Sequence, residues 1–425
     1  MTNPQEVIMK RLRIMAFVLM LVSVMVVSCK KQEEEPSPQE LYYDLIRVKA
    51  DLANSSVRGL YDPAVFDELG KEILDGNVTG TDCYYRLKKI FSSFHVAHVN
   101  IGKTGSEKID NMALPMVFYN FGNEYHISSA VKKYKKYLGW KIVEMNGISI
   151  NEAIDKVAQF RSYETEVAKK YFLEHNIPYN DYKYAGLLDE NEKLRLKLES
   201  PDGKTEELKL KFIDVRKAKF NKFQPLKENE CLPHFVTEKY DIKPCPEKRT
   251  LYIPINSCME REDYPVSEWF EDIIKELDKG SYDTLVFDLR YNPGGTMFTY
   301  GLPEKYKDVL DKYNIALVAN GRTFSASTWF MESILTVCPD AKIFGEETGE
   351  AIFNYTGVRN EELKALKCKI IFPMYLDEIS PLTNLKKRTS EYYRGIMPDV
   401  EVQEDFEVFM QGEDAIYNAI YNYFN

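Results

Sequence analysis

The sequence of 425 residues lacks the features that would place it in several simple classes. It has no basic excess: the formal net charge is -10, and acidic residues are spread along most of the chain. A nucleic-acid partner would require a basic stripe, so none is expected. No low-complexity tract or repeat stands out, and hydrophobic residues make up 44%. The composition therefore indicates a globular chain with two or three domains.

Metal-binding patterns are also missing. Cys-x-x-Cys does not occur, and no histidine joins a cysteine at ligand spacing, so no metal site is expected. No cofactor is expected either. Cys231 and Cys245 lie in a Pro-rich stretch and could form a disulfide in an exported protein, although spacing alone does not establish the pair.

The apolar run near the N-terminus is short for a membrane span. Ile14–Val27 has 14 residues, whereas a span needs about 20. A basic region at residues 9–13 precedes it and Ser28-Cys29 follows, an order that fits a secretory signal starting at Met9. The segment ending at Cys29 resembles a bacterial lipobox. An ordinary signal peptide with an incidental cysteine is the alternative, but the charged, Pro-containing segment that follows favours a lipoprotein.

These features predict a lipoprotein signal peptide at residues 1–29 and a tether at residues 30–38. Lipid on Cys29 would hold the chain to a membrane without spanning it. Glu33–Glu35 is similar to the export tag of some outer-surface lipoproteins. The predicted location is the cell envelope, as an outer membrane lipoprotein on the periplasmic or surface-exposed face.

Three regions with different patterns follow the tether. Residues 39–97 are predicted to be helical, because apolar residues recur at helical spacing. Residues 98–235 are predicted to be β-rich, with turn signals at Asn146-Gly147 and Pro201–Gly203. In residues 236–425 short apolar strands alternate with helices, which predicts an α/β core with a largely parallel sheet.

Ser325 lies in Thr323-Phe324-Ser325-Ala326-Ser327, between a buried strand and a predicted helix. Amides at a helix N-terminus favour negative charge. A serine there can attack a carbonyl while the Ala326 amide helps to hold the oxyanion. The alternative is a helix cap, which Thr323, Ser325 or Ser327 could provide. This segment alone does not decide between them.

A second segment, Asp288–Gly295, runs from a buried strand into a Pro-Gly-Gly loop. Two glycines allow positive φ and close backbone approach. Such a loop can present N–H groups to an anion. The alternative is a plain turn, with Asp288 and Arg290 forming a structural ion pair.

Together these segments resemble the C-terminal processing peptidase family, also called tail-specific proteases. The matching motifs occur in order at Asp288–Gly295, Ser325–Ser327, Gly345–Gly349 and Gly395–Asp399. The resemblance covers the C-terminal half well and the N-terminal half loosely, where residues 142–150 are similar to the family's PDZ-like module. A plain β-hairpin domain is the alternative for that part.

The resemblance implies a ClpP/crotonase-like αββ core, preceded by the N-terminal helical region and a β-rich, PDZ-like module. It also implies that Ser325 is the nucleophile. By the same analogy Gly294 or Gly295 joins Ala326 in the oxyanion hole.

The general base distinguishes two branches of this family. One branch uses a lysine 25 residues after the serine, where this chain has Glu350, so a Ser–Lys dyad is disfavoured. The chain is closer to the tricorn-core and interphotoreceptor retinoid-binding protein-like branch, in which a histidine from the N-terminal part is the base. His98 aligns best, with Val96 in place of an aspartate, and imidazole suits proton transfer. His95 is the rival, and either could be an ordinary residue at a helix end.

A triad also needs a carboxylate to orient the histidine. The tricorn-like branch has a glutamate just before Gly-Val-x-Pro-Asp, which implies Glu391, with Glu350 and Glu346 as rivals.

The predicted function is therefore a serine peptidase that cleaves peptides or proteins through an acyl-enzyme. One alternative is a catalytically inactive binding protein on the same fold, and another is an interaction protein carried on the tether. The distance from His98 to Ser325 separates the first two, since proton transfer requires hydrogen-bond reach (~2.6–3.2 Å, looser without substrate).

Overall fold

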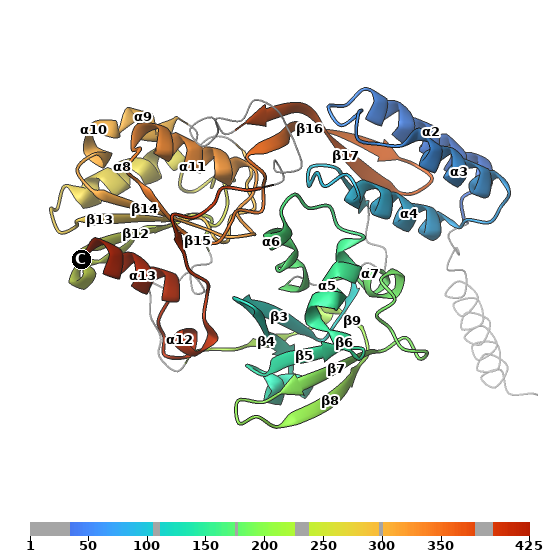
Figure 1. The fold of residues 1–425 in the computed structure, drawn as a ribbon, viewed down its shortest axis with the longest axis horizontal. Coiled ribbons are helices and arrows are strands. Elements are labelled where there is room, and N and C mark those ends of the chain that lie inside the picture. The colour runs from blue at the N-terminus through green and yellow to red at the C-terminus, as the bar shows by residue number, and fades with distance from the viewer. Residues whose placement is uncertain (1–34, 105–110, 175–176, 226–237, 297–300, 379–393) are drawn as a thin grey trace, which may run out of the picture.

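The computed structural model describes residues 35–104, 111–174, 177–225, 238–296, 301–378 and 394–425. Its helices and sheets form the predicted α/β class, arranged in three regions (Figure 1). The N-terminal helices and a six-stranded core lie at opposite ends of this view, and the β-rich region lies below them.

The N-terminal region consists of helices whose starts are set by local capping. They are α2 (Pro38–Ala53), α3 (Pro63–Leu74) and α4 (Gly80–Ser92). Ser37 and Thr79 each form a capping box, and the Asp62 side chain accepts from the Ala64 amide. The helices predicted within residues 39–97 are therefore present.

The β-rich region is built around an antiparallel sheet with the order β10-β4-β5-β7-β8, to which β3 and β6 are added. Its strands are β3 (Met116–Phe121), β4 (Glu124–Val131), β5 (Lys141–Met145), β6 (Ile148–Ser149), β7 (Leu194–Glu199), β8 (Thr205–Leu210) and β10 (Phe220–Lys222). Both turn signals are confirmed. Asn146 and Gly147 take φ of 50° and 83° between β5 and β6, and residues 200–204 join β7 to β8.

Helical segments interrupt this region between β6 and β7. They are α5 (Ile150–Ala158), α6 (Glu166–Lys169), the short 3-10 helix η2 (Phe172–Glu174) and α7 (Tyr179–Tyr184). A separate strand pair joins β2 (Met112–Ala113) to β9 (Ile213–Asp214). The chain between β6 and β7 therefore does more than connect two strands: it places residues 160–174 next to the core.

The C-terminal core is a six-stranded sheet with the order β11-β12-β13-β14-β15-β18. Its strands are β11 (Lys243–Cys245), β12 (Thr250–Pro254), β13 (Thr284–Asp288), β14 (Asn314–Ala319), β15 (Lys342–Gly345) and β18 (Val400–Glu401). Every pair is parallel except β11 with β12, so the predicted largely parallel sheet is confirmed.

Helices cover both faces of the core sheet. They are α8 (Val266–Leu277), α9 (Leu302–Lys305), α10 (Lys307–Leu310), α11 (Ala326–Val337) and α13 (Ala415–Phe424), whereas α12 (Phe406–Met410) packs on Phe121 of the β-rich region. Leu285 and Phe287 of β13 pack in the cluster with α8 and α11, whereas Val286 packs with α13. Burial on both faces explains the unbroken apolar runs of these strands.

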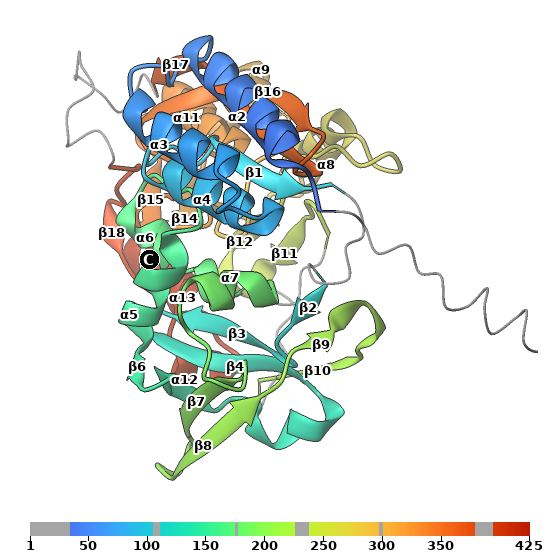
Figure 2. The same cartoon turned by 90° about the vertical axis from the view of Figure 1, so that its right-hand side faces the viewer.

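One predicted strand of the core belongs elsewhere. β16 (Phe353–Leu363) and β17 (Cys368–Glu378) form an antiparallel hairpin, and β17 pairs with β1 (Asn100–Lys103). The hairpin leaves the core and reaches the N-terminal helices (Figures 1 and 2). Ile370 and Phe372 are buried there with residues of α2 and α4. β17 lies in residues 236–425, where strands of a largely parallel sheet were expected, but its partners are antiparallel.

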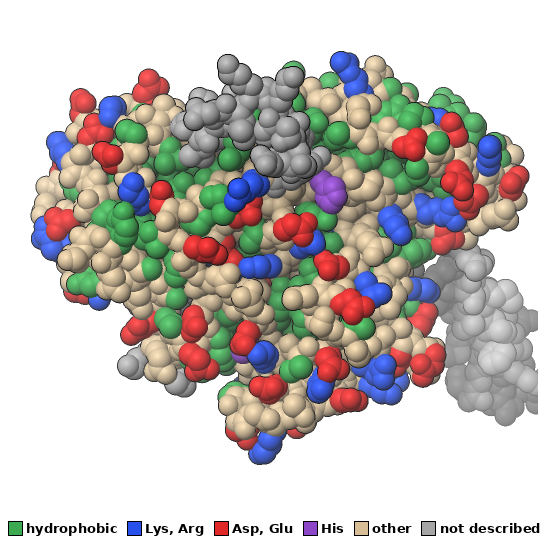
Figure 3. All heavy atoms as spheres, in the orientation of Figure 1, with side chains coloured by type: hydrophobic (Ala, Val, Ile, Leu, Met, Phe, Trp, Pro, Cys, Tyr) green, Lys and Arg blue, Asp and Glu red, His purple; other side chains and the backbone are tan. Residues whose placement is uncertain are grey.

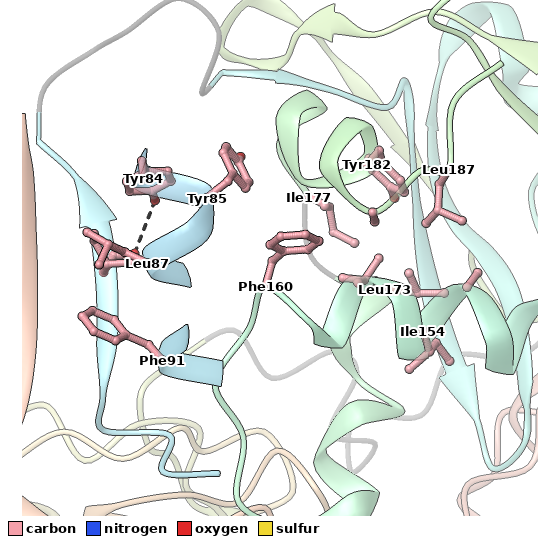
Figure 4. Close-up of a cluster of buried hydrophobic side chains, with 14 of the residues drawn as sticks. Tyr84, Tyr85, Leu87, Phe91, Ile154, Phe160, Leu173, Ile177, Tyr182 and Leu187 are labelled. Atoms are coloured by element: carbon pink, nitrogen blue, oxygen red, sulfur yellow. Dashed lines mark hydrogen bonds between the residues drawn. The ribbon is translucent and has the colours of Figure 1, made fainter. Parts of the chain in front are cut away.

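One hydrophobic cluster joins the N-terminal helices to the β-rich region. Tyr85 and Phe91 of α4 lie in this cluster with Ile154 of α5 and Tyr182 of α7. Phe160, which follows α5, lies in it as well (Figure 4). The predicted boundary between residues 39–97 and 98–235 is thus crossed by a common core. Val96 and Val99, on either side of His98 in the sequence, are buried in this cluster.

Other sequence predictions have separate outcomes. Cys245 is in a disulfide, whereas Cys231 and the lipobox lie outside the described residues. No helix in the described ranges is both long and apolar enough to cross a membrane. Acidic and basic side chains are mixed on the face in Figure 3.

Candidate active site

Three neighbouring parallel strands bring most of the site together. β13, β14 and β15 end at the same edge of the core sheet, and their following loops contain Gly294–Gly295, Ser325 and Glu350. Crevices at the carboxyl ends of parallel strands are the usual sites for ligands in such sheets. His98 comes from the loop between α4 and β1.

Ser325 occupies a tight turn directly before α11. Its φ and ψ are 58° and -129°, a conformation that is strained for a residue with a side chain. Its side chain makes no capping hydrogen bond. The Ser327 hydroxyl accepts from the Phe324 amide at 2.9 Å and so braces the turn on either side of Ser325. The hydroxyl of Ser325 is thus left to project from a strained strand-to-helix turn, as a nucleophile would.

The Pro-Gly-Gly loop lies against this turn. A Cβ on Gly294 would lie 2.6 Å from the Ser325 Cβ, so only glycine fits there. The Gly294 amide donates to the Asn292 side chain at 2.8 Å. Neither the Gly295 amide nor the Ala326 amide donates to a backbone carbonyl of the described chain. Of the predicted oxyanion donors, Gly295 and Ala326 are therefore the available pair.

The ion pair expected between Asp288 and Arg290 is present as well. The Arg290 Nη2 lies 2.7 Å from the Asp288 carboxylate, and its Nη1 lies 2.8 Å from Asp414. Arg290 is 1% exposed. This ion pair fixes the start of the loop. Asp288–Gly295 can therefore contain a structural ion pair and also present backbone amides.

His98 lies within reach of Ser325. Its Nε2 is 3.3 Å from the Ser325 Oγ, at the looser end of the hydrogen-bond range expected without substrate. Its ring packs on Phe324 at 4.7 Å between centroids. Burial lowers the pKa of His98 to about 4, so the ring is neutral at pH 7 and can accept a proton. The rival His95 contacts the Tyr163 ring instead.

Glu350 is the carboxylate that the structure brings to His98. Its Oε1 is 3.8 Å from the His98 Nδ1, and its Oε2 accepts from the Thr328 hydroxyl. Glu346 is directed elsewhere, since it pairs with Lys170 at 2.9 Å. Glu391 lies outside the described residues, so the prediction for it stays untested. The residue at position 350 argued against a lysine base, and in the structure it is an acid whose carboxyl faces the His98 ring.

Glu164 is a site residue that the sequence did not indicate. It is 2% exposed, and its two oxygens accept from the amides of Ala97 at 3.2 Å and Ala351 at 2.9 Å. Ala97 directly precedes His98, and Ala351 directly follows Glu350. Burial, and then repulsion from Glu164, raise the pKa of Glu350 well above its ordinary value.

The Gly395–Asp399 motif braces the loop that carries Glu350. The Gly395 amide donates to Glu347 at 2.7 Å, and the Ile396 amide donates to the Thr348 hydroxyl at 2.8 Å. The Gly349 amide donates to the Thr323 carbonyl at 3.0 Å. The motif used to place Glu391 therefore helps to position Glu350 beside the Ser325 turn.

Comparisons with known proteins address the fold. No protein-family model and no curated protein matches the sequence. Mature CPAF complexed with lactacystin is 11% identical, with a TM-score of 0.60, 91% of this chain and 97% of that chain covered. Mature CPAF alone gives 11% identity, a TM-score of 0.59, and coverage of 91% and 96%. The photosystem II D1 C-terminal processing protease is 12% identical, with a TM-score of 0.40, and the match covers 87% of this chain and 94% of that chain. The chain thus shares the fold of mature CPAF.

Proposed function

We propose that this chain is a serine peptidase that cleaves peptides or proteins through an acyl-enzyme. The observation that carries the proposal is the contact of 3.3 Å between the His98 Nε2 and the Ser325 Oγ. It occurs at a strained strand-to-helix turn, beside two amides suited to an oxyanion, on the fold of the S41-type proteases.

In the first half-reaction the neutral His98 takes the proton of the Ser325 hydroxyl as its Oγ bonds to the carbonyl carbon. The oxyanion that forms accepts from the amides of Gly295 and Ala326. The imidazolium then gives its proton to the leaving nitrogen, which breaks the amide bond and leaves an ester on Ser325. Water attacks that ester with His98 again as the base, and the acid product leaves.

The carboxyl group of Glu350 acts on the charged form of His98. The imidazolium has a second N–H at Nδ1, and the Glu350 Oε1 lies 3.8 Å from that atom. A small closing movement would make this a hydrogen bond, which favours the imidazolium during proton transfer.

Labelling by a fluorophosphonate probe tests the nucleophile. The wild type should be labelled, and Ser325→Ala should not. Ser333→Ala is the matched control, because it removes a hydroxyl from the same helix that bonds only to the Phe330 carbonyl. Labelling that survives in Ser325→Ala would exclude this assignment.

A second candidate is the non-catalytic binding protein on the same fold. The observation that favours it is the open link between His98 and Glu350, whose facing atoms, Nδ1 and Oε1, are both buried and have no hydrogen-bond partner among the described residues. Folded wild-type chain that neither labels nor cleaves any peptide would support this candidate over the peptidase.

We also propose that lipid on Cys29 anchors the chain in the cell envelope, facing the periplasm or the outside. The lipobox-like segment and the charged tether support this. Metabolic labelling with an alkyne fatty acid, followed by membrane fractionation, tests it. Cys29→Ala should lose the label and leave the membrane fraction, and a membrane-bound, unlabelled wild type would refute lipidation.

A further inference from the structure

A cavity of about 630 Å³ lies next to the candidate active site. Ala97, Pro293, Phe324 and Gly349 line it. Each of these residues directly precedes a site residue: His98, Gly294, Ser325 and Glu350, respectively. The cavity therefore adjoins each of the loops that carry the reacting groups. Its volume is in the range of sites that bind small ligands or side chains.

Seven of the 18 residues that line the cavity are aromatic, and they come from both halves of the chain. The β-rich half contributes rings of β3, of the loop before α6, and of η2; the core contributes rings from the loops after β13 and β14. These rings belong to Phe118, Tyr119, Tyr163, Tyr171, Phe172, Tyr291 and Phe324. Aromatic faces offer large contact area to apolar and aromatic groups.

The polar side chains of the wall are bonded to the protein itself. The Ser128 hydroxyl donates to the Val117 carbonyl at 3.1 Å, and the Ser162 hydroxyl donates to the Val99 carbonyl. The Asn100 side chain accepts from the Ile101 amide at 2.7 Å. A ligand that requires many new hydrogen bonds would compete with these, whereas an apolar ligand would not.

The cationic group in the wall is already matched by carboxylates. Arg322 makes two contacts of 2.6 Å with Glu174, and its Nη1 lies 3.2 Å from Glu404. Its guanidinium also packs on Tyr171 and Tyr119, at 4.1 and 4.9 Å from the ring centroids. One cation therefore faces two acids, and an acidic substrate group would add a third negative charge.

We propose that this aromatic cavity binds a large apolar or aromatic side chain of the peptide, next to the scissile bond, and rejects acidic side chains. The inference rests on the proposed peptidase function, because it concerns which peptides that site would bind. It can nevertheless be tested without catalysis, because binding requires only the cavity.

The test measures peptide binding by the full chain carrying Ser325→Ala, which cannot acylate. The probes are fluorescein-labelled peptides with blocked ends, identical except for one central residue: Phe, Leu, Ala or Glu. Fluorescence anisotropy should show the Phe and Leu peptides binding at least about tenfold more tightly than the Glu peptide, given the 10–200-fold worth of a methylene group in an apolar pocket. Equal affinities, or tighter binding of the Glu peptide, would overturn the inference.

A cavity-filling variant provides the second arm. Ala168 lies in the wall, so Ala168→Phe in the same background should weaken the Phe peptide about tenfold and the Ala peptide much less. Ala64→Phe, on the exposed face of α3, is the control and should change neither. A uniform loss for all peptides with Ala168→Phe would contradict the inference. Failure of the peptidase proposal would appear separately, as a wild type that fluorophosphonate does not label.

Discussion

The core and the N-terminal half contribute different kinds of group to one site. The core supplies Ser325, the oxyanion amides and Glu350 from three adjacent strand ends, whose spacing is set by parallel sheet hydrogen bonds. The N-terminal half supplies His98, 227 residues before Ser325, and Glu164, both from loops. The proposed nucleophile is therefore built into one fold unit, whereas the proposed base depends on the packing of two.

The largest effect should come from removing His98, the proposed base that the N-terminal half contributes. His98→Ala should lower the rate of peptide cleavage by about 10⁴-fold or more, because the Ser325 hydroxyl would lose its proton acceptor. The matched control is His95→Ala, whose ring contacts Tyr163 and not the serine. Comparable rates for His98→Ala and His95→Ala would show that the N-terminal half does not supply the base.

Glu350→Gln should have a smaller effect, of about 100-fold on kcat/KM. The comparison is the ~10⁴-fold loss when a hydrogen-bonded triad aspartate is neutralised. Here the carboxylate is 3.8 Å from the imidazole, so its contribution is expected to be weaker. Glu346→Gln, in the neighbouring ion pair with Lys170, should leave kcat near that of the wild type. A larger loss with Glu346→Gln than with Glu350→Gln would contradict the assignment.

Glu164→Gln tests how the two halves are held together. One carboxylate accepts from amides next to His98 and Glu350, and an amide side chain can accept from only one of them. We expect a loss of about tenfold in kcat, equivalent to ~1.4 kcal/mol, with little change in KM.

The control for this variant is Glu166→Gln, which removes an exposed carboxylate two residues later. Glu164→Gln should also lower the pH at which Glu350 titrates, because it removes a negative charge that raises the pKa of that carboxyl. A drop in thermal stability with an unchanged pH profile would mean that Glu164 is only structural.

The smallest effect concerns the acid limb of the wild type. An ordinary imidazole has a pKa of about 6.5, and burial lowers that of His98 to about 4. The base form then persists as the pH falls to about 4, so fluorophosphonate labelling should have its acid midpoint near pH 4. A midpoint near 6.5 would indicate that His98 is more exposed to water, or closer to a charged carboxylate, than in this structure.

Local patterns predicted the core well and its connections less well. Unbroken apolar runs and the Ser-Ala-Ser segment predicted β13, β14 and the turn of Ser325, since each depends on nearby residues. The β17 strand was also expected, but its pairing with β1 was not. Strand periodicity shows that a segment is extended without showing which strand it pairs with.

The site followed the same division. Ser325, His98 and the glycine loop came from motifs, and the structure brings them together. Glu164 has no motif, because its role is to accept from two backbone amides that any sequence would provide. The choice between Glu346 and Glu350 depended on loop geometry, and Glu391 stays a prediction because it lies outside the described residues.

The β16–β17 hairpin links the two halves more directly than their packing does. β16 begins three residues after Glu350, and β17 pairs with β1, which begins two residues after His98, with Asn100 opposite Ile371. A shift of one residue in this pairing would move β1 by about 3.3 Å, as far as the whole contact from His98 to Ser325. The alignment of β17 with β1 thus sets whether His98 can reach Ser325.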